Sequence, residues 1–245
     1  MDRIWTQKFK IMSFQIDRNN NLSMHALSGI FQEAAGEHAR TLGFGYEEMT
    51  VKGWVWVLSR IKIKISRIPT WREEVNLRTW VVERGRMLSR RDFELLDKDG
   101  KRLVSAVTMW ALLDLKAKRP VVLEKIDFGF PYRPEERVME EEPGKLTVPA
   151  EARDSGTYRV KYSDIDMNGH MNNIHYVRIV VDSYPLDWLD THIVREMEIN
   201  YRAEARINDE LLIRTHSEGD NFIHQVVNQE DGRTVAVVRI VWDIR

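Results

Sequence analysis

Cysteine is absent from the 245-residue chain, and this absence excludes several kinds of site at once. Without thiols there is no disulfide, no thiolate metal ligand and no cysteine nucleophile. Long apolar runs are lacking too, since none approaches the roughly 20 residues that a membrane span needs. Residues 1–5 lack the apolar core of a signal peptide. We therefore expect a protein of the reducing cytoplasm.

A marked excess of charge of one sign is also missing. Charged residues make up 31% of the chain, yet the formal net charge is only −1, so no global field attracts nucleic acid or an anionic membrane. His170 and His175 are five residues apart and would diverge by about 140° on a helix. With no clustered set of histidines and carboxylates elsewhere, we expect neither a metal nor a cofactor.

The chain contains one structural pattern twice. Residues 9–17 resemble residues 158–166 at an offset of 149 (166 − 17), and residues 77–80 parallel residues 213–216 at an offset of 136 (214 − 78). Both halves run in the order of short strand, polar turn, helix and several strands. Such self-similarity indicates duplication of one unit, and the drifting offset indicates insertions and deletions between the copies.

Each half predicts one main helix followed by strands. In the first half Ser23 is a suitable N-cap, apolar residues recur at helical spacing, and Gly43 is expected to end the helix. The second helix is expected from about Asn172 and ends before Pro185. Alternating runs and Asp-Gly turns downstream predict antiparallel hairpins. The expected class is therefore α+β, with two tandem repeats in which a helix is wrapped by an antiparallel sheet.

The predicted boundaries follow from composition. Residues 1–125 form the first unit, residues 157–245 the second, and residues 126–156 a linker that holds four of the chain's seven prolines and the acidic run 140–142. Such a composition favours a solvated tether that crosses the surface.

Asp166, Asn168 and His170 occupy alternate positions just before the second helix. In an extended segment these three side chains would point the same way and could face one reacting centre. The helix start, at Met171, Asn172 and Asn173, would offer backbone N–H donors and a positive dipole end to a developing oxyanion. The alternative is a polar turn that only caps the helix.

The first half provides an internal comparison for this motif. Asn21 stands where the second half has His170, since 170 − 149 = 21. If the site uses histidine, only the second copy is complete, and the first is free to bind substrate.

The stretch from Asp164 to Tyr176 resembles the signature of the acyl-acyl-carrier-protein thioesterases of plant plastids and bacteria. Further similar segments occur in both halves: Phe31–Ala35, Arg90–Phe93, the strand around Trp110, and Tyr201–Glu204. The resemblance implies a double hotdog fold with the acyl chain bound mainly by the first hotdog. It also implies release of a free fatty acid from acyl carrier protein, within fatty acid biosynthesis and lipid metabolism.

Carried over by position, the resemblance assigns catalytic roles to Asp166, Asn168, His170 and Glu204. Many plant members have a cysteine directly after the glutamate, where this chain has Ala205. A thiol mechanism is therefore excluded, and a carboxylate must activate water or itself attack the thioester. The sequence leaves open which carboxylate acts.

Basic residues at Arg84, Arg86, Arg90 and Arg91, with Lys116, Lys118 and Arg119, allow two interpretations. They either protect a solvated sheet edge against aggregation or form a docking surface for acidic acyl carrier protein.

Other functions remain open on the same fold: an acyl-CoA thioesterase, a hotdog dehydratase, or a non-hydrolytic module that binds acyl chains or their carrier. The intact second motif argues against the binding module, and the lack of an obvious nucleotide site disfavours CoA. We expect either a monomer built from its internal pair of hotdogs or a homodimer.

Overall fold

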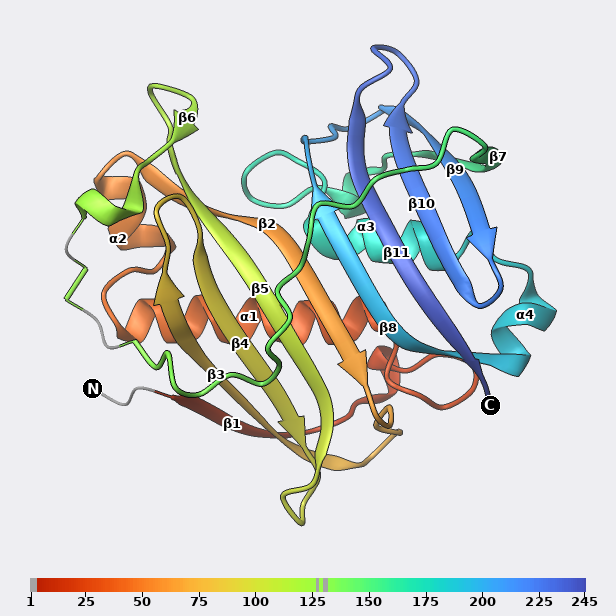
Figure 1. The fold of residues 1–245 in the computed structure, drawn as a ribbon, viewed down its shortest axis with the longest axis horizontal. Coiled ribbons are helices and arrows are strands. Elements are labelled where there is room, and N and C mark those ends of the chain that lie inside the picture. Colours follow the sequence, from red (N-terminus) through yellow and green to blue (C-terminus); the bar gives the residue numbers. More distant parts are fainter. Residues whose placement is uncertain (1–3, 127, 130–131) are drawn as a thin grey trace. The chain divides into compact units, whose positions relative to one another are not determined.

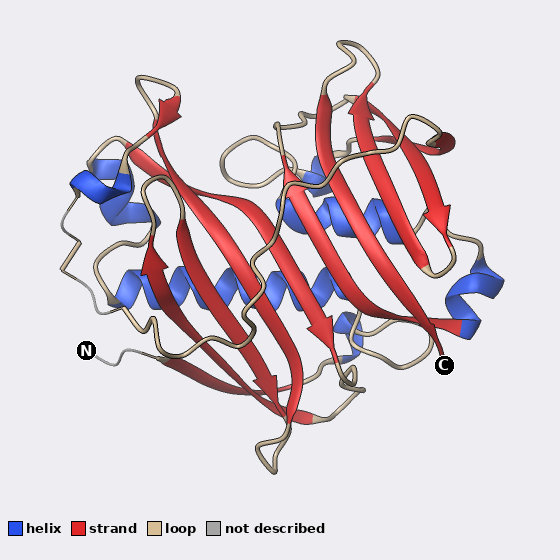
Figure 2. Ribbon diagram, in the orientation of Figure 1, coloured by secondary structure: helices blue, strands red, loops and turns tan. Residues whose placement is uncertain are grey.

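The computed structural model describes residues 4–126, 128–129 and 132–245, and the chain divides into two compact units, Met1–Pro143 and Gly144–Arg245. In each unit one long helix lies on one face of an antiparallel sheet (Figure 1, Figure 2). This arrangement confirms the predicted α+β class.

The described residues of the first unit form six strands, of which β6 is the shortest, and two α-helices. Its sheet has the order β1-β3-β4-β5-β2, and the short β6 pairs with β5. Two 3₁₀ helices, Ser13–Gln15 and Leu123–Lys125, complete it. The elements are β1 (Trp5–Lys10), α1 (Met24–Thr41), α2 (Tyr46–Val51), β2 (Trp54–Ile65), β3 (Glu74–Arg84), β4 (Ser89–Leu96), β5 (Arg102–Asp114) and β6 (Arg119–Pro120).

The second unit repeats this plan on a smaller scale. Its strands have the order β7-β9-β10-β11-β8, which matches the first unit strand for strand. The equivalence confirms the duplication predicted from the sequence. The elements are β7 (Arg153–Arg159), a 3₁₀ helix (Tyr162–Asp164), α3 (Asn173–Val181), α4 (Leu186–Thr191), β8 (His192–Tyr201), β9 (Glu210–Glu218), β10 (Asn221–Asn228) and β11 (Thr234–Ile244).

The helix starts are those that the capping residues predicted. The hydroxyl of Ser23 accepts a hydrogen bond from the N–H of Ala26 (3.2 Å), and the side-chain oxygen of Asn172 accepts one from the N–H of Ile174 (3.2 Å). Each bond satisfies one of the N–H groups that a helix start leaves without a partner. The apolar face of α1 packs on its sheet, where the ring of Phe31 lies 4.9 Å from that of Phe93.

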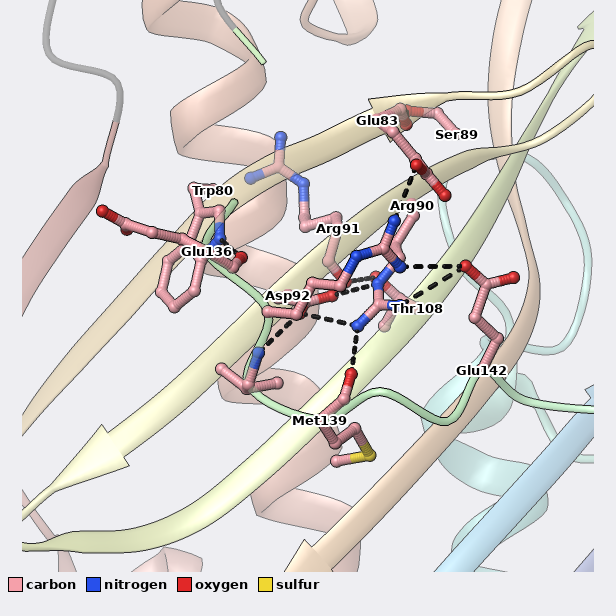
Figure 3. A network of polar contacts seen from close by, with 12 residues as sticks. Trp80, Glu83, Ser89, Arg90, Arg91, Asp92, Thr108, Glu136, Met139 and Glu142 are labelled. Carbon is pink, nitrogen blue, oxygen red and sulfur yellow. Dashed lines mark hydrogen bonds and ion pairs between the residues drawn. The ribbon is translucent and has the colours of Figure 1, made fainter. Parts of the chain in front are cut away.

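The linker differs from the solvated tether that its composition predicted. Within the first unit, its residues 138–142 lie on the open face of the sheet (Figure 3). The buried guanidinium of Arg90 binds the Asp92 carboxylate (2.8 and 2.9 Å) and the carbonyl oxygen of Met139 (2.6 Å). Asp92 in turn accepts the N–H of Val138 (2.9 Å). Burial raises the pKa of Asp92, and the Arg90 cation opposes that rise.

The next linker residues attach to the second unit in the same manner. The N–H of Gly144 donates to the carboxylate of Glu198 (2.6 Å), and that of Leu146 donates to the side-chain oxygen of Asn200 (2.8 Å). Both acceptors are buried on β8, so they hold in place a stretch of backbone that composition alone predicts to be free in solvent. Strand β7 begins at Arg153, four residues before the predicted start of the second unit at 157 (157 − 153).

Candidate active site

Asp166, Asn168 and His170 lie on a tight turn, so the expected extended segment was wrong. The N–H of Asp166 donates to the carbonyl oxygen of His170 (2.9 Å), and the N–H of Gly169 donates to that of Asp166 (3.0 Å). Gly169 adopts a φ of +79°, a left-handed conformation that glycine reaches without steric cost. The carboxylate of Asp166 accepts the N–H of Asn168 (2.8 Å). The polar turn weighed as the alternative is therefore the local structure.

The first unit contains the same turn 149 residues earlier (166 − 17). There the N–H of Asp17 donates to the carbonyl oxygen of Asn21 (2.7 Å), and Asn20 has a φ of +65° where the second turn has Gly169. The carboxylate of Asp17 accepts the N–H groups of Asn19 and Asn21, both at 2.9 Å. Each turn follows a 3₁₀ helix and precedes a capped α-helix, so the offset inferred from the sequence is confirmed here.

His170 and Glu204 contact each other directly. The Nε2 atom of His170 lies 2.8 Å from a carboxylate oxygen of Glu204, and the two side chains are 27% and 58% exposed. Asp166 and Asn168 lie on the same turn as His170. The side-chain amide of Asn168 has no hydrogen-bond partner among the described residues and is open to solvent. The structure thus pairs two of the four predicted catalytic side chains, and the other two residues lie on the turn that carries His170.

The backbone around Ala205 sets the position of Glu204. The carbonyl oxygen of Ala205 accepts a hydrogen bond from the N–H of Met171 (2.8 Å). The N–H of Ala205 donates one to the hydroxyl of Tyr176 on α3 (3.1 Å). Burial raises the pKa of Tyr176, so its hydroxyl stays protonated. Ala205 itself is fully buried. These two bonds hold the segment that carries Glu204 against the segment that carries His170.

Two of the three expected oxyanion donors are already in use. The N–H of Met171 donates to Ala205, and that of Asn172 donates to the carbonyl oxygen of Asp164 (2.8 Å). The expectation for Met171 and Asn172 was therefore wrong. The N–H of Asn173, the first residue of α3, has no acceptor within the part of the chain that the structure describes. It is one of the donors that a helix start leaves open.

A buried cluster around Asp164, behind the turn, was not predicted from the sequence. The carboxylate of Asp164, 1% exposed, accepts hydrogen bonds from Arg178 (2.6 Å), the Tyr158 hydroxyl (2.7 Å) and the Lys161 N–H (2.8 Å). Burial, together with the bond to Asp164, raises the pKa of Tyr158. The cluster ties the 3₁₀ helix before the turn to α3 and β7. Asp164 stands inside the motif, but its two side-chain partners lie on separate elements that no spacing rule connects to it.

The four arginines predicted to dock a carrier do not share one surface. Adjacent residues on a strand face opposite sides, so Arg90 lies under the linker while Arg91 faces α1. Arg91 is 6% exposed and contacts His38 (2.9 Å) and Thr79 (3.2 Å), and burial lowers its pKa to about 10. Arg84 donates to the carbonyl oxygen of Ile126. Arg90 and Arg91 were therefore wrongly predicted as docking residues, and of the four only Arg86 is exposed.

Two features are absent from the residues that the structure describes. Among these residues no group of three or more histidines and carboxylates is arranged to hold a metal ion. None of the helices that the structure describes combines the length and the apolar character required to cross a membrane.

Tandem helix-on-sheet units, with the His170–Glu204 pair in the second, define a protein of the double hotdog class. The family pattern for the acyl-ACP thioesterase N-terminal domain matches residues 2–126, and that for the acyl-ACP thioesterase C-terminal domain matches residues 148–244. The chain belongs to the acyl-ACP thioesterase family.

Individual proteins agree with this assignment. An acyl-ACP thioesterase structure from Bacteroides thetaiotaomicron is 30% identical, with a TM-score of 0.91 and 98% of each chain covered. A 12:0-ACP thioesterase from Umbellularia californica shares the fold, at 24% identity and a TM-score of 0.85, over 100% of this chain and 99% of that one. A chloroplastic acyl-[acyl-carrier-protein] hydrolase of Cuphea viscosissima is 29% identical over 96% of this chain, which spans 61% of that relative's length.

Proposed function

We propose that this chain hydrolyses the thioester of fatty acyl-acyl carrier protein and releases a free fatty acid. The observation that carries the proposal is the contact between His170 and Glu204, with Asp166 and Asn168 on the same turn. A module that only binds acyl chains has no need of this arrangement. Membership of the acyl-ACP thioesterase family supplies the substrate class.

Glu204 is the group best placed to activate water. Its carboxylate is more than half exposed and borders His170, whereas one oxygen of Asp166 is engaged by its own turn. As water attacks the thioester carbonyl carbon, Glu204 accepts a proton from the water. The carbon–sulfur bond then breaks, and the proton passes to the departing thiolate of the carrier. Positioned general bases typically contribute about 10²–10⁴ in rate.

The oxygen of the attacked carbonyl becomes negatively charged and needs a donor. We assign this role to the N–H of Asn173, which also lies at the positive end of the α3 dipole. One such donor is worth about 10²–10³ in rate. His170 relays the proton between Glu204 and the leaving sulfur, and the amide of Asn168 holds the attacking water.

A carboxylate that attacks the thioester itself is the other route left open by the sequence, and it passes through an anhydride on the enzyme. Turnover in water enriched with heavy oxygen separates the two routes. Direct attack by water leaves the protein unlabelled. Heavy oxygen at Glu204 or Asp166, detected by mass spectrometry of the digested protein, would reveal an anhydride that water opens at the enzyme's own carbonyl.

The substrate assignment is tested with matched thioesters on acyl carrier protein and on CoA, at medium and long chain lengths. We expect faster hydrolysis of the carrier-bound chains, with the His170→Ala variant as the inactive control. Equal or better turnover of acyl-CoA would refute the carrier assignment. Activity is expected to survive extensive chelation. With this substrate, the proposed setting is cytoplasmic fatty acid biosynthesis.

A further inference from the structure

Exposed basic residues gather at one end of the sheet in the first unit. They come from four separate segments: the end of α2, the β3–β4 turn, the β5–β6 turn and the second 3₁₀ helix. The structure leaves six of these side chains open to solvent, namely Lys52, Arg86, Lys116, Lys118, Arg119 and Lys125.

Backbone contacts bring these segments together. The N–H of Leu123 donates to the carbonyl oxygen of Arg86 (2.9 Å), which places the second 3₁₀ helix beside the β3–β4 turn. Asp114 and Arg119 pair across β5 and β6. The N–H of Leu115 donates to the carbonyl oxygen of Gly53 (2.9 Å), which adds the end of α2. Figure 1 shows α2 and β6 at the same end of this unit.

The six cations are not held in local ion pairs. None of the six forms an ion pair within 4 Å among the residues that the structure describes. Five acids lie within four sequence positions of the six cations, namely Glu48, Glu83, Asp114, Glu124 and Asp127, and Glu83 is itself paired with Arg137 (2.8 Å). Asp114 is itself occupied, because it accepts the N–H groups of Lys116 (2.9 Å) and Ala117 (2.7 Å), and these bonds lower its pKa.

Apolar side chains are exposed among the cations. Val51 is 90% exposed, Leu115 51% and Met87 36%. Arg86 and Met87 also line a cavity of about 300 Å³. Exposed apolar side chains surrounded by charges of one sign are typical of a surface that binds a partner of the opposite charge. A sheet edge that only faces solvent does not require exposed apolar side chains.

We propose that this end of the first unit, formed by the six cations and the three apolar residues, is where acidic acyl carrier protein docks. The proposal rests on the proposed function, which requires the carrier to present its acyl thioester to this chain. Complementary charge raises the rate of encounter and fixes the orientation of the partner. Of the basic residues that the sequence offered for docking, this site keeps Arg86, Lys116, Lys118 and Arg119. It leaves out the buried Arg90 and Arg91 and adds Lys52 and Lys125.

The test compares two variants with the same change of charge on the same unit. Lys116→Glu/Lys125→Glu reverses two cations of the proposed surface. Lys98→Glu/Lys101→Glu reverses two exposed cations in the β4–β5 turn, at the opposite end of those strands. Both are assayed with an acyl-carrier-protein substrate and with the N-acetylcysteamine thioester of the same acyl chain.

For the surface variant we expect KM for the carrier substrate to rise about tenfold, because reversal of rim charges slows association and weakens orientation. Its turnover of the small thioester should stay within about twofold of the parent, as should both activities of the control variant. Added salt should raise KM of the parent towards that of the surface variant, since exposed charges are screened.

An unchanged KM in the surface variant would overturn the docking site, as would an equal rise in the control variant or an equal loss with the small thioester. Failure of the proposed function looks different: the unmodified protein would then hydrolyse the small thioester but show no preference for the carrier-bound chain.

Discussion

The turn Asp17–Asn21 of the first unit and the turn Asp166–His170 of the second share their backbone but not their chemistry. Both close with the same hydrogen bond and both hold an aspartate that caps its own turn. His170 stands where the first copy has Asn21, and Glu204 stands where it has Ile68 (204 − 136 = 68), a residue 6% exposed. Duplication has therefore preserved a scaffold, and two of the exchanged side chains supply the candidate catalytic pair.

The two turns are also anchored differently. In the first, the side chain of Gln15 accepts the N–H of Met12 (2.9 Å), and in the second Asp164 accepts the equivalent N–H of Lys161 (2.8 Å). Only Asp164 is held in addition by an arginine and a tyrosine. The first copy has Phe9 and Gly29 at those positions (158 − 149 and 178 − 149). The turn with the catalytic candidates thus has the stiffer support, as a preorganised site requires.

The largest expected difference between the copies concerns His170. His170→Ala should reduce kcat by about 10³, because it removes the partner of Glu204 and a proton relay. Asn21→Ala is the matched control and should leave hydrolysis within about twofold, since its side chain is not expected to take part. Steady-state kinetics on acyl-acyl carrier protein measures both. Comparable losses in two folded variants would refute the asymmetry.

Glu204→Gln should lower kcat by about 10², because it removes the charge and basicity of a positioned general base while keeping its size. The thermal midpoint should change little, since the side chain is 58% exposed. Glu210→Gln, on β9, provides a control at a similarly exposed carboxylate, 52% accessible. Near-parental turnover of Glu204→Gln would leave Asp166 as the base, and a matching collapse of stability would make Glu204 structural.

Asp164→Asn should act through position rather than chemistry. It weakens three hydrogen bonds to a buried carboxylate, which costs about 1–3 kcal/mol of stability, and loosens the turn so that kcat falls about tenfold. KM for the carrier substrate should be unchanged. Gln15→Ala, at the same place in the first copy, should leave kcat intact. A rise in KM with constant kcat would contradict a positioning role.

The interiors of the two sheets should also respond differently to pH. His224, 1% exposed, bonds Tyr184 (2.7 Å) and Thr215 (2.8 Å), and burial lowers its pKa from 6.5 to about 3. Between about pH 3 and pH 6.5 the unfolded chain therefore carries a proton on His224 that the folded unit does not carry. The stability that neutral His224 contributes is fully present above about pH 6.5 and is lost as the pH falls towards 3.

The corresponding register position in the first sheet is Phe93, which pairs with Thr79 and Ala106 as His224 pairs with Thr215 and Val238. Denaturant titrations at pH 7.5 and 4.5 should differ by about 2 kcal/mol, and His224→Phe should reduce that difference. A variant that keeps the full pH dependence would assign it to other groups.

The smallest effect is expected at the left-handed position of the two turns, which is Asn20 in the first copy and Gly169 in the second. Gly169→Asn should change stability by less than about 0.5 kcal/mol, because asparagine tolerates left-handed backbone and Asn20 already adopts it. No atom lies within 4 Å of a Cβ built on Gly169. Gly169→Val should cost about 1–2 kcal/mol from backbone strain alone. Thermal melts compare them, and equal losses in the two variants would indicate a packing constraint instead.

The elements predicted correctly from the sequence are those whose structure is determined by neighbouring residues. Ser23 and Asn172 as caps, the Asp-Gly hairpins and the duplicated turn all follow from neighbouring residues. The predicted strand segments 54–58 and 60–65 merge into β2, with an irregularity at Ser59 that no local signal marks. The exposure of Arg90 and Arg91 depends on what covers each face of β4, and the contact between His170 and Glu204 depends on loop closure over 34 residues (204 − 170). These long-range features need the assembled fold.

The linker contacts bear on how the two halves could be recombined with those of relatives. Residues 138–142 bind the first sheet through Arg90 and Asp92, whereas residues 144–146 bind the second through Glu198 and Asn200. A crossover between Pro143 and Gly144 keeps every one of these contacts with its native partner. A crossover at residue 126 or 156 would separate one set of acceptors from its backbone and leave buried polar groups without partners. Chimeras joined at the first position should therefore fold more often than those joined at either end of the proline-rich segment.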